Sequence, residues 1–205
     1  MIGSFTTTDI VEIIITLLIS MTVHEFMHGF VGYKLGDITA RRDGRLSLNP
    51  LKHIDPVMTV ILPIITLIIF KVPILAAKPV PFDPRNVKYG EFGVAMLAAA
   101  GPLSNLVLAF IAAVVLQHVN VGLFMANFLE LFVFYNVIMF VFNLIPIPPL
   151  DGSRILYAFS PEALQEVMQR IEPMGMFIVI ALVLVGGLNI LTSIYNLVFR
   201  ALGVV

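Results

Sequence analysis

The chain has 205 residues, of which 59% are hydrophobic and 12% are charged, and its formal net charge is -1. Soluble domains are about half apolar and about a quarter charged, so this composition indicates an integral membrane protein and excludes a basic surface for nucleic acid. Cysteine is absent, which excludes disulfides and thiolate ligands or nucleophiles, and residues 1–205 leave room for one membrane domain of about five spans.

The first predicted element is a membrane-spanning helix between Asp9 and Gly36. Asp9 followed three residues later by Glu12 resembles a capping box, and Gly36 is a typical helix stop. The 26 or so residues between them make about 39 Å of helix, which is enough to cross a bilayer. No basic region precedes the apolar run and no cleavage site follows it, so we expect a retained span.

This helix contains the pattern His24-Glu25-Phe26-Met27-His28. Histidines four residues apart share one helix face and can bind one zinc ion, and Glu25 lies close enough to polarise a zinc-bound water. Ionisable side chains are costly within a bilayer and mark functional sites there. The alternative, that the two histidines only pack against other helices, does not account for that cost.

The stretch between the first helix and residue 91 is mixed. Residues 36–56 are polar, and Arg45–Asn49 alternate polar and apolar side chains, which predicts a short strand. Residues 57–70 are apolar, but fourteen residues of helix cover only about 21 Å of the roughly 30 Å core. We therefore expect a re-entrant or short segment there, followed by a Pro-rich charged loop over residues 71–91.

Three further spans are predicted, over residues 92–116, 123–142 and 174–199. Prolines in the 143–152 run forbid continued helix, and Ser160-Pro161 predicts the start of a short charged helix. The expected fold is an all-α polytopic transmembrane bundle with about four full spans, a re-entrant or short fifth segment, and a small β element near the active site.

Lysine and arginine are unevenly distributed along the chain. If residues 57–70 enter the membrane and return, eleven of the 12 basic residues lie on one side; if they cross, each side carries six. The positive-inside rule favours the first arrangement, with the N-terminus outside and the basic loops in the cytoplasm. In that arrangement Asp151 emerges on the same side as the His24/His28 end of the first span.

A catalytic zinc site typically has three protein ligands and an open position for water. Asp151 is the strongest candidate for the third ligand, because it lies near the end of the proline-broken run Pro146–Gly152. Irregular backbone at membrane depth is tolerated only where it is buried or lines a wet cavity. The alternative is an ordinary exposed turn at the membrane interface.

Three motifs in order, H-E-x-x-H, G-P-x-x-N at residues 101–105 and N-x-x-P-x-x-x-L-D-G at residues 143–152, resemble those of the site-2 protease family of intramembrane zinc metalloproteases. The resemblance covers about residues 10 to 155. It implies one Zn²⁺ per chain with His24, His28 and Asp151 as ligands. It also implies Glu25 as the catalytic glutamate and Asn143 as a residue that holds the substrate or the oxyanion.

The remaining correspondences are weaker. Gly101 and Asn105 match the family's middle motif and are candidate substrate-binding residues. Leu46 and Leu48 lie in the predicted strand, which resembles the family's re-entrant sheet and offers an edge for strand addition by an unwound substrate. Ser153 stands where the family often has a second glycine. A span ahead of the first motif and a PDZ or CBS domain, common in the family, are not expected here.

The function indicated is an intramembrane zinc endopeptidase in the cell membrane, with its active site towards the cytoplasm. Its expected partners are the lipid bilayer and a transmembrane-helix protein or peptide as substrate, such as a membrane-tethered regulator or a leftover signal peptide. The alternatives are a metal-binding membrane transporter and an inactive scaffold of the same fold. The sequence gives neither the substrate nor the oligomeric state.

Overall fold

The computed structural model describes residues 7–61 and 78–182, together with residues 193, 197 and 200. This part of the chain is mostly helical and contains no strand. Its α-helices are α1 (Thr7–Lys34), α2 (Thr39–Arg42), α4 (Gly90–His118), α5 (Leu123–Asn143), α6 (Asp151–Phe159), α7 (Glu162–Ile171) and α8 (Gly175–Leu182). Shorter turns of helix are η1 (Pro50–Lys52), η2 (Pro56–Ile61), η3 (Pro84–Asn86) and η4 (Glu172–Met174).

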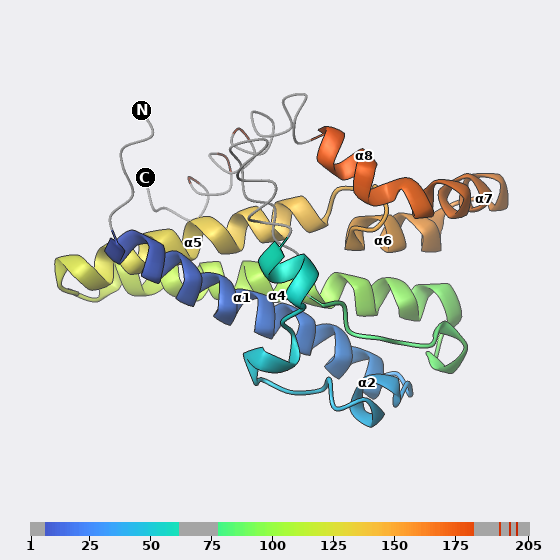
Figure 1. The fold of residues 1–205 in the computed structure, drawn as a ribbon, viewed down its shortest axis with the longest axis horizontal. Coiled ribbons are helices and arrows are strands. Elements are labelled where there is room, and N and C mark those ends of the chain that lie inside the picture. The colour runs from blue at the N-terminus through green and yellow to red at the C-terminus, as the bar shows by residue number, and fades with distance from the viewer. Residues whose placement is uncertain (1–6, 62–77, 183–192, 194–196, 198–199, 201–205) are drawn as a thin grey trace.

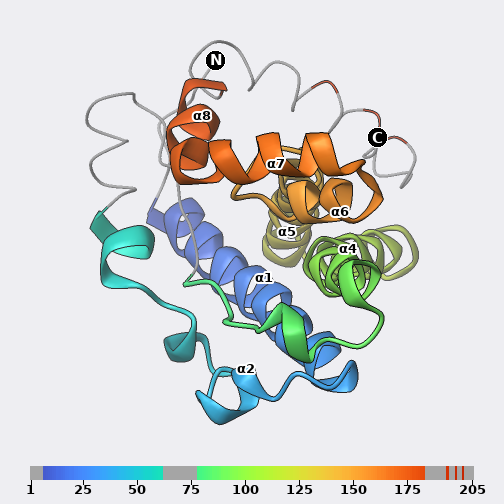
Figure 2. The same ribbon diagram turned by 90° about the vertical axis from the view of Figure 1, so that its right-hand side faces the viewer.

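Helices α1, α4 and α5 form the body of the molecule, and each is long and apolar enough to cross a membrane. They lie side by side, with α4 packed against both α1 and α5 and antiparallel to them (Figures 1 and 2). Helix α6 also packs on α4. The end of α1, the start of α4 and the end of α5 therefore lie at the same end of the bundle (Figure 1).

Small side chains allow α4 and α5 to approach closely. Ala109 and Ala113 on α4 are almost fully buried against Val133 and Val137 on α5. Transmembrane helices associate through such packing, because lipid tails are as apolar as the side chains they replace. The opposite face of α4 is apolar and exposed, as at Ile111, which is what a lipid-facing surface requires.

The first long apolar helix is confirmed, but its predicted start is wrong. Helix α1 already includes Thr7, so Asp9 lies inside the helix and does not cap it. Threonine costs little in a helix interior, so the polar residues before Asp9 do not stop the helix. Glu12 is consequently a buried helical residue and not part of a capping box. Gly36, with a φ of 106°, follows the helix end as predicted.

The chain between α1 and α4 leaves and returns at one end of the bundle. The amide of Lys88 donates to the carbonyl of Leu35 at 2.8 Å, which joins the two ends of this connection. A segment that enters the membrane and returns to the same side, as expected for residues 57–70, also requires both ends of the connection to lie at one end of the bundle. Residues 56–61 form a π-helix, and the rest of the predicted segment lies outside the described residues.

The short strand predicted at residues 45–49 does not form. The amides of Arg45 and Leu46 both donate to the carbonyl of Ala40, and the amide of Ser47 donates to the carbonyl of Arg45. These local bonds use the backbone groups that a strand would offer to a partner. The alternation of polar and apolar residues was therefore misleading, because a loop fixed by its own turns can show the same pattern over five residues.

The C-terminal part differs from the prediction in one element. Helix α6 begins at Asp151 itself, directly after the prolines, where we expected irregular backbone. A side chain at Gly152 would lie 2.7 Å from the carbonyl oxygen of Ile145, so glycine lets the new helix start close against the preceding chain. The predicted short helix is α7, and the last predicted span begins as α8 but lies mostly outside the described residues.

The α4–α5 contact gives a stability prediction. Ala113→Leu forces a larger side chain against Val133 and Val137, and we expect the free energy of unfolding to fall by about 1–3 kcal/mol. Ile111→Leu, on the lipid-facing side of the same helix, is the control and should change little. Thermal unfolding in detergent measures both, and equal stabilities for the two variants would contradict this packing.

Candidate metal centre

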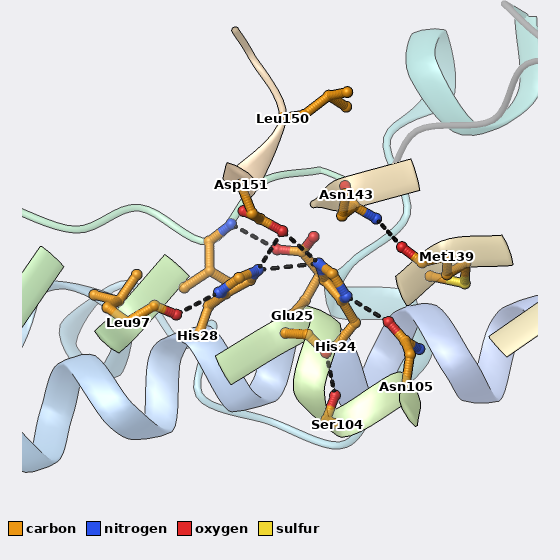
Figure 3. A network of polar contacts seen from close by, with 12 residues as sticks. His24, Glu25, His28, Leu97, Ser104, Asn105, Met139, Asn143, Leu150 and Asp151 are labelled. Atoms are coloured by element: carbon orange, nitrogen blue, oxygen red, sulfur yellow. Dashed lines mark hydrogen bonds and ion pairs between the residues drawn. The ribbon is translucent and has the colours of Figure 1, made fainter. Parts of the chain in front are cut away.

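His24, His28 and Asp151 meet at one point inside the bundle (Figure 3). The histidines come from successive turns of α1, and Asp151 is the first residue of α6. Asp151 Oδ2 lies 3.2 Å from His24 Nε2 and 3.3 Å from His28 Nε2, and the two Nε2 atoms are 3.0 Å apart. Both imidazoles are buried. Two nitrogens and one oxygen in this arrangement form a group that can hold a metal ion.

The hydrogen bonds on the far sides of the imidazoles decide which nitrogens face the centre. His24 Nδ1 lies 2.7 Å from Asn105 Oδ1, and His28 Nδ1 lies 2.8 Å from the carbonyl oxygen of Leu97. Both neighbours are acceptors, so each Nδ1 carries the proton and each neutral ring presents an Nε2 lone pair to the centre. Asp151 Oδ2 is buried there without a conventional hydrogen-bond donor. Three converging electron pairs fit a bound cation.

A chain of side-chain amides fixes the ring of His24. Asn105 Nδ2 donates to Asn136 Oδ1 at 3.0 Å, and Asn136 Nδ2 donates to the carbonyl of Phe132 at 2.8 Å. Asn105 and Asn136 are both fully buried. Because Asn136 Nδ2 donates to a carbonyl, Asn136 Oδ1 is the atom that accepts from Asn105 Nδ2. Asn105 Oδ1 is then the atom that faces His24, and it accepts the hydrogen of His24 Nδ1. Partners of this kind hold a metal-binding histidine in the correct tautomer and orientation.

Gly101 faces the metal centre from α4. A Cβ at this position would lie 2.6 Å from His24 Nε2 and would overlap His28 Nε2. Only glycine leaves room for both imidazoles at this crossing. The backbone of α4 thus passes directly beside the point where the three candidate ligands meet.

Glu25 lies next to the metal group and is 8% exposed. Its Oε2 accepts a hydrogen bond of 2.9 Å from the backbone amide of Val80, which belongs to the loop before α4. This bond fixes one carboxylate oxygen and leaves the other outside that contact. Figure 3 shows the carboxylate beside His24 and Asp151.

Asn143 ends α5, and Figure 3 shows it on the same side of the two histidines as Asp151. Its Nδ2 donates to the carbonyl of Met139 at 2.9 Å, so this donor is engaged within its own helix. Leu46 is half-buried under α1 near Gly29, and Leu48 is 60% exposed. Neither leucine belongs to a strand, so the structural basis expected for substrate addition at these residues is missing.

Three parts of the centre were not identified in the sequence. Asn136 is the first of these, although an asparagine within an apolar span indicates a buried hydrogen-bond partner. The carbonyl of Leu97 and the amide of Val80 are backbone groups, which no residue pattern reveals. His53 is not part of the centre; its Nε2 lies 2.7 Å from the carbonyl oxygen of Ser47.

Comparison with known proteins agrees with this geometry. Residues 117–186 match the family described as "Peptidase family M50". The chain is 36% identical over 181 residues to "Putative zinc metalloprotease YwhC" of Bacillus subtilis, covering 83% of this chain and 78% of that protein. The chain belongs to peptidase family M50.

Two further M50 relatives carry the name "Putative zinc metalloprotease Rip2". The protein of Mycolicibacterium smegmatis is 29% identical over 185 residues, covering 84% of this chain and 66% of its own length. The protein of Mycobacterium tuberculosis H37Rv is 27% identical over 177 residues, covering 84% and 65%. The chain thus spans about two thirds of the Rip2 proteins. No solved structure gives a significant match.

Membership of this site-2 protease family makes the chain a membrane metalloprotease with zinc as its metal. The His24, His28 and Asp151 group fits that metal on its own chemistry, since imidazole nitrogen and carboxylate oxygen are common zinc ligands.

The amide chain behind His24 gives a testable prediction. Asn105→Ala removes the acceptor that fixes the Nδ1 proton, and we expect zinc affinity to fall about 10- to 100-fold. Leu103→Ala, on the exposed face of α4, is the control. Competition with a fluorescent zinc chelator measures both affinities, and wild-type affinity in the Asn105 variant would exclude an orienting role.

The close approach at Gly101 gives a second prediction. In Gly101→Ala the added methyl group takes the space beside both Nε2 atoms, so we expect zinc stoichiometry well below one while the helical content persists. Metal analysis of purified protein and far-ultraviolet circular dichroism give these two quantities. Full zinc occupancy in the variant would show that α4 does not limit the metal site.

Proposed function

We propose that this protein is an intramembrane zinc endopeptidase that hydrolyses peptide bonds within or near the transmembrane segments of other membrane proteins. The observation that carries the proposal is the convergence of His24, His28 and Asp151, with Glu25 beside them, inside a bundle of membrane-length helices. Membership of family M50 supports the peptidase chemistry.

In this proposal His24, His28 and Asp151 would hold one zinc ion, which would supply a Lewis acid for activating water and the scissile carbonyl. Glu25 acts as the general base and accepts a proton from the attacking water. It then gives this proton to the leaving nitrogen as the peptide bond breaks. The bond from Val80 holds one carboxylate oxygen, so the other is the one available for proton transfer.

Asn143 is proposed to act on the substrate carbonyl. One N–H of its Nδ2 donates to the carbonyl of Met139, and an amide nitrogen carries two N–H groups, so the second is the one that would donate to a substrate oxygen. Losing one such donor to an oxyanion typically costs about 2.7 to 4 kcal/mol of transition-state stabilisation. We assign Gly101 and Asn105 to the metal centre and no longer to substrate binding. Asn105 hydrogen-bonds His24, and Gly101 leaves the space that both imidazoles occupy.

The substrate is proposed to be a transmembrane helix that is locally unwound, because its backbone groups are otherwise bonded within the helix. The cell membrane is the proposed location, with the centre towards the cytoplasm. In support, the ends of α1, α4 and α5 nearest the centre lie together with the basic connection between α1 and α4 (Figure 1).

One observation favours a second candidate, metal or proton transport. Glu12, Thr16 and Ser20 are buried on α1 at four-residue spacing, and His24 and His28 continue the same row. The hydroxyl groups of Thr16 and Ser20 have no hydrogen-bond partner within the described part of the chain. This row places an ionisable group, Glu12, in the half of α1 away from the metal centre, as a path for ions across the membrane would require.

The variant Glu25→Gln separates the two candidates. The protease proposal predicts unchanged zinc content and loss of cleavage, because glutamine cannot accept the proton; a general base typically contributes about 10²–10⁴-fold. Glu166→Gln, on the exposed face of α7, is the control.

Cleavage of a transmembrane-helix substrate in detergent or vesicles measures the effect, with zinc analysis alongside. Undiminished cleavage by Glu25→Gln would overturn the protease proposal. Zinc or proton flux across vesicles containing the wild-type protein, without cleavage, would establish the transporter in its place.

A further inference from the structure

The loop that contacts Glu25 has the sequence Lys78-Pro79-Val80-Pro81. Proline has no amide hydrogen, so Val80 provides the N–H group in the run from Pro79 to Pro81. That N–H donates to Glu25 Oε2 at 2.9 Å. The fixed φ angles of the flanking prolines reduce the freedom of this short segment. The position of the Glu25 carboxylate therefore depends on where the loop lies.

Arg45 holds this loop. Its guanidinium donates to the carbonyls of Lys78 and Pro79, the latter at 3.3 Å, and also to the carbonyl of Lys52. Beside it, the amide of Lys78 donates to the carbonyl of His53 at 3.0 Å. The guanidinium thus joins the loop after α1 to the residues directly before Val80.

The environment of Arg45 is unusual for a surface loop. The residue is only 8% exposed, and within the described ranges 7–61 and 78–182 it forms no ion pair with a carboxylate. Burying a cation without a counter-charge is costly, and backbone carbonyls offset that cost only where their positions match the donors. A planar guanidinium can bond several carbonyls at once in a fixed geometry, whereas a lysine ammonium cannot.

We propose that Arg45 is a positioning residue for catalysis, which fixes the Lys78–Pro81 loop so that the amide of Val80 holds Glu25 for proton transfer. This inference rests on the proposed role of Glu25 as general base. It also gives residues 45–53 a role other than an edge for the substrate: they support the Glu25 carboxylate through the Arg45 guanidinium and the backbone of residues 78–80.

Two variants at Val80 test the contact itself. Val80→Pro removes the N–H group, and Val80→Ala keeps it while shortening the side chain. We expect kcat of the proline variant to be at least about tenfold below that of the alanine variant, with KM and zinc content similar, since small misplacements of a catalytic group cost up to about 10²-fold.

Variants at Arg45 test the support. Arg45→Gln should lower kcat about 10- to 100-fold without changing KM or zinc content, and Arg45→Lys should recover only part of the loss. Arg85→Gln is the matched control, because Arg85 is an exposed arginine of the same connection that pairs with Asp83 at 2.8 Å. If Arg45 acts through Val80, the Arg45→Gln/Val80→Pro double variant should be no worse than the poorer single variant.

Hydrogen exchange gives a readout that does not depend on activity. The prolines leave Val80 as the exchanging amide between residues 79 and 81, so its protection can be followed by mass spectrometry of a short peptide. We expect faster exchange in Arg45→Gln than in wild type and in Arg85→Gln. Unchanged exchange and unchanged kcat in Arg45→Gln, while Glu25→Gln is inactive, would overturn this inference and leave the protease proposal standing.

A purely structural role for Arg45 has a different signature. In that case kcat, zinc content and thermal stability would fall together, and Arg45→Lys would behave like Arg45→Gln in all three. That result would also overturn the inference. Cleavage by Glu25→Gln would instead remove the proposed function on which it rests.

Discussion

The close contact between α1 and α4 is the constraint on which the metal centre depends. At this crossing His24 meets Asn105, His28 meets the carbonyl of Leu97, and Gly101 leaves space for both rings. All three interactions come from one face of α4, and each sets the position or the protonation of an imidazole. The crossing therefore determines both how close the helices lie and which nitrogens face the metal.

The centre combines elements that are far apart in the chain. Helix α1 supplies the histidines and Glu25, α4 orients them, and Asp151 joins from the start of α6. Helix α5 contributes indirectly, since Asn136 completes the amide chain behind His24. The connection between α1 and α4 has a separate role, because its Val80 amide donates a hydrogen bond to the carboxylate of Glu25. Metal binding and base positioning are thus supported by different parts of the molecule.

The sequence predicted the long helices from their apolar runs and helical spacing. It predicted the meeting of Asp151 with the histidine pair from the distribution of basic residues, the need for a third zinc ligand and the resemblance of the motifs. It did not predict the contacts of Val80 and Leu97, which are made by backbone atoms. The alternation at residues 45–49 wrongly predicted a strand, since Arg45 N bonds Ala40 within the same loop. Tertiary hydrogen bonds of this kind leave no pattern in residue type.

Asp151 is the first residue of α6, while its two partners lie on α1 more than a hundred residues earlier. An ion shared by these groups closes a very long loop, and it ties the C-terminal helices to the N-terminal one. Closing such a loop restricts the unfolded chain more than the folded one. A bound metal would therefore also act as a cross-link, and α6 would be held to α1 more tightly in the zinc-loaded form than in the apo form.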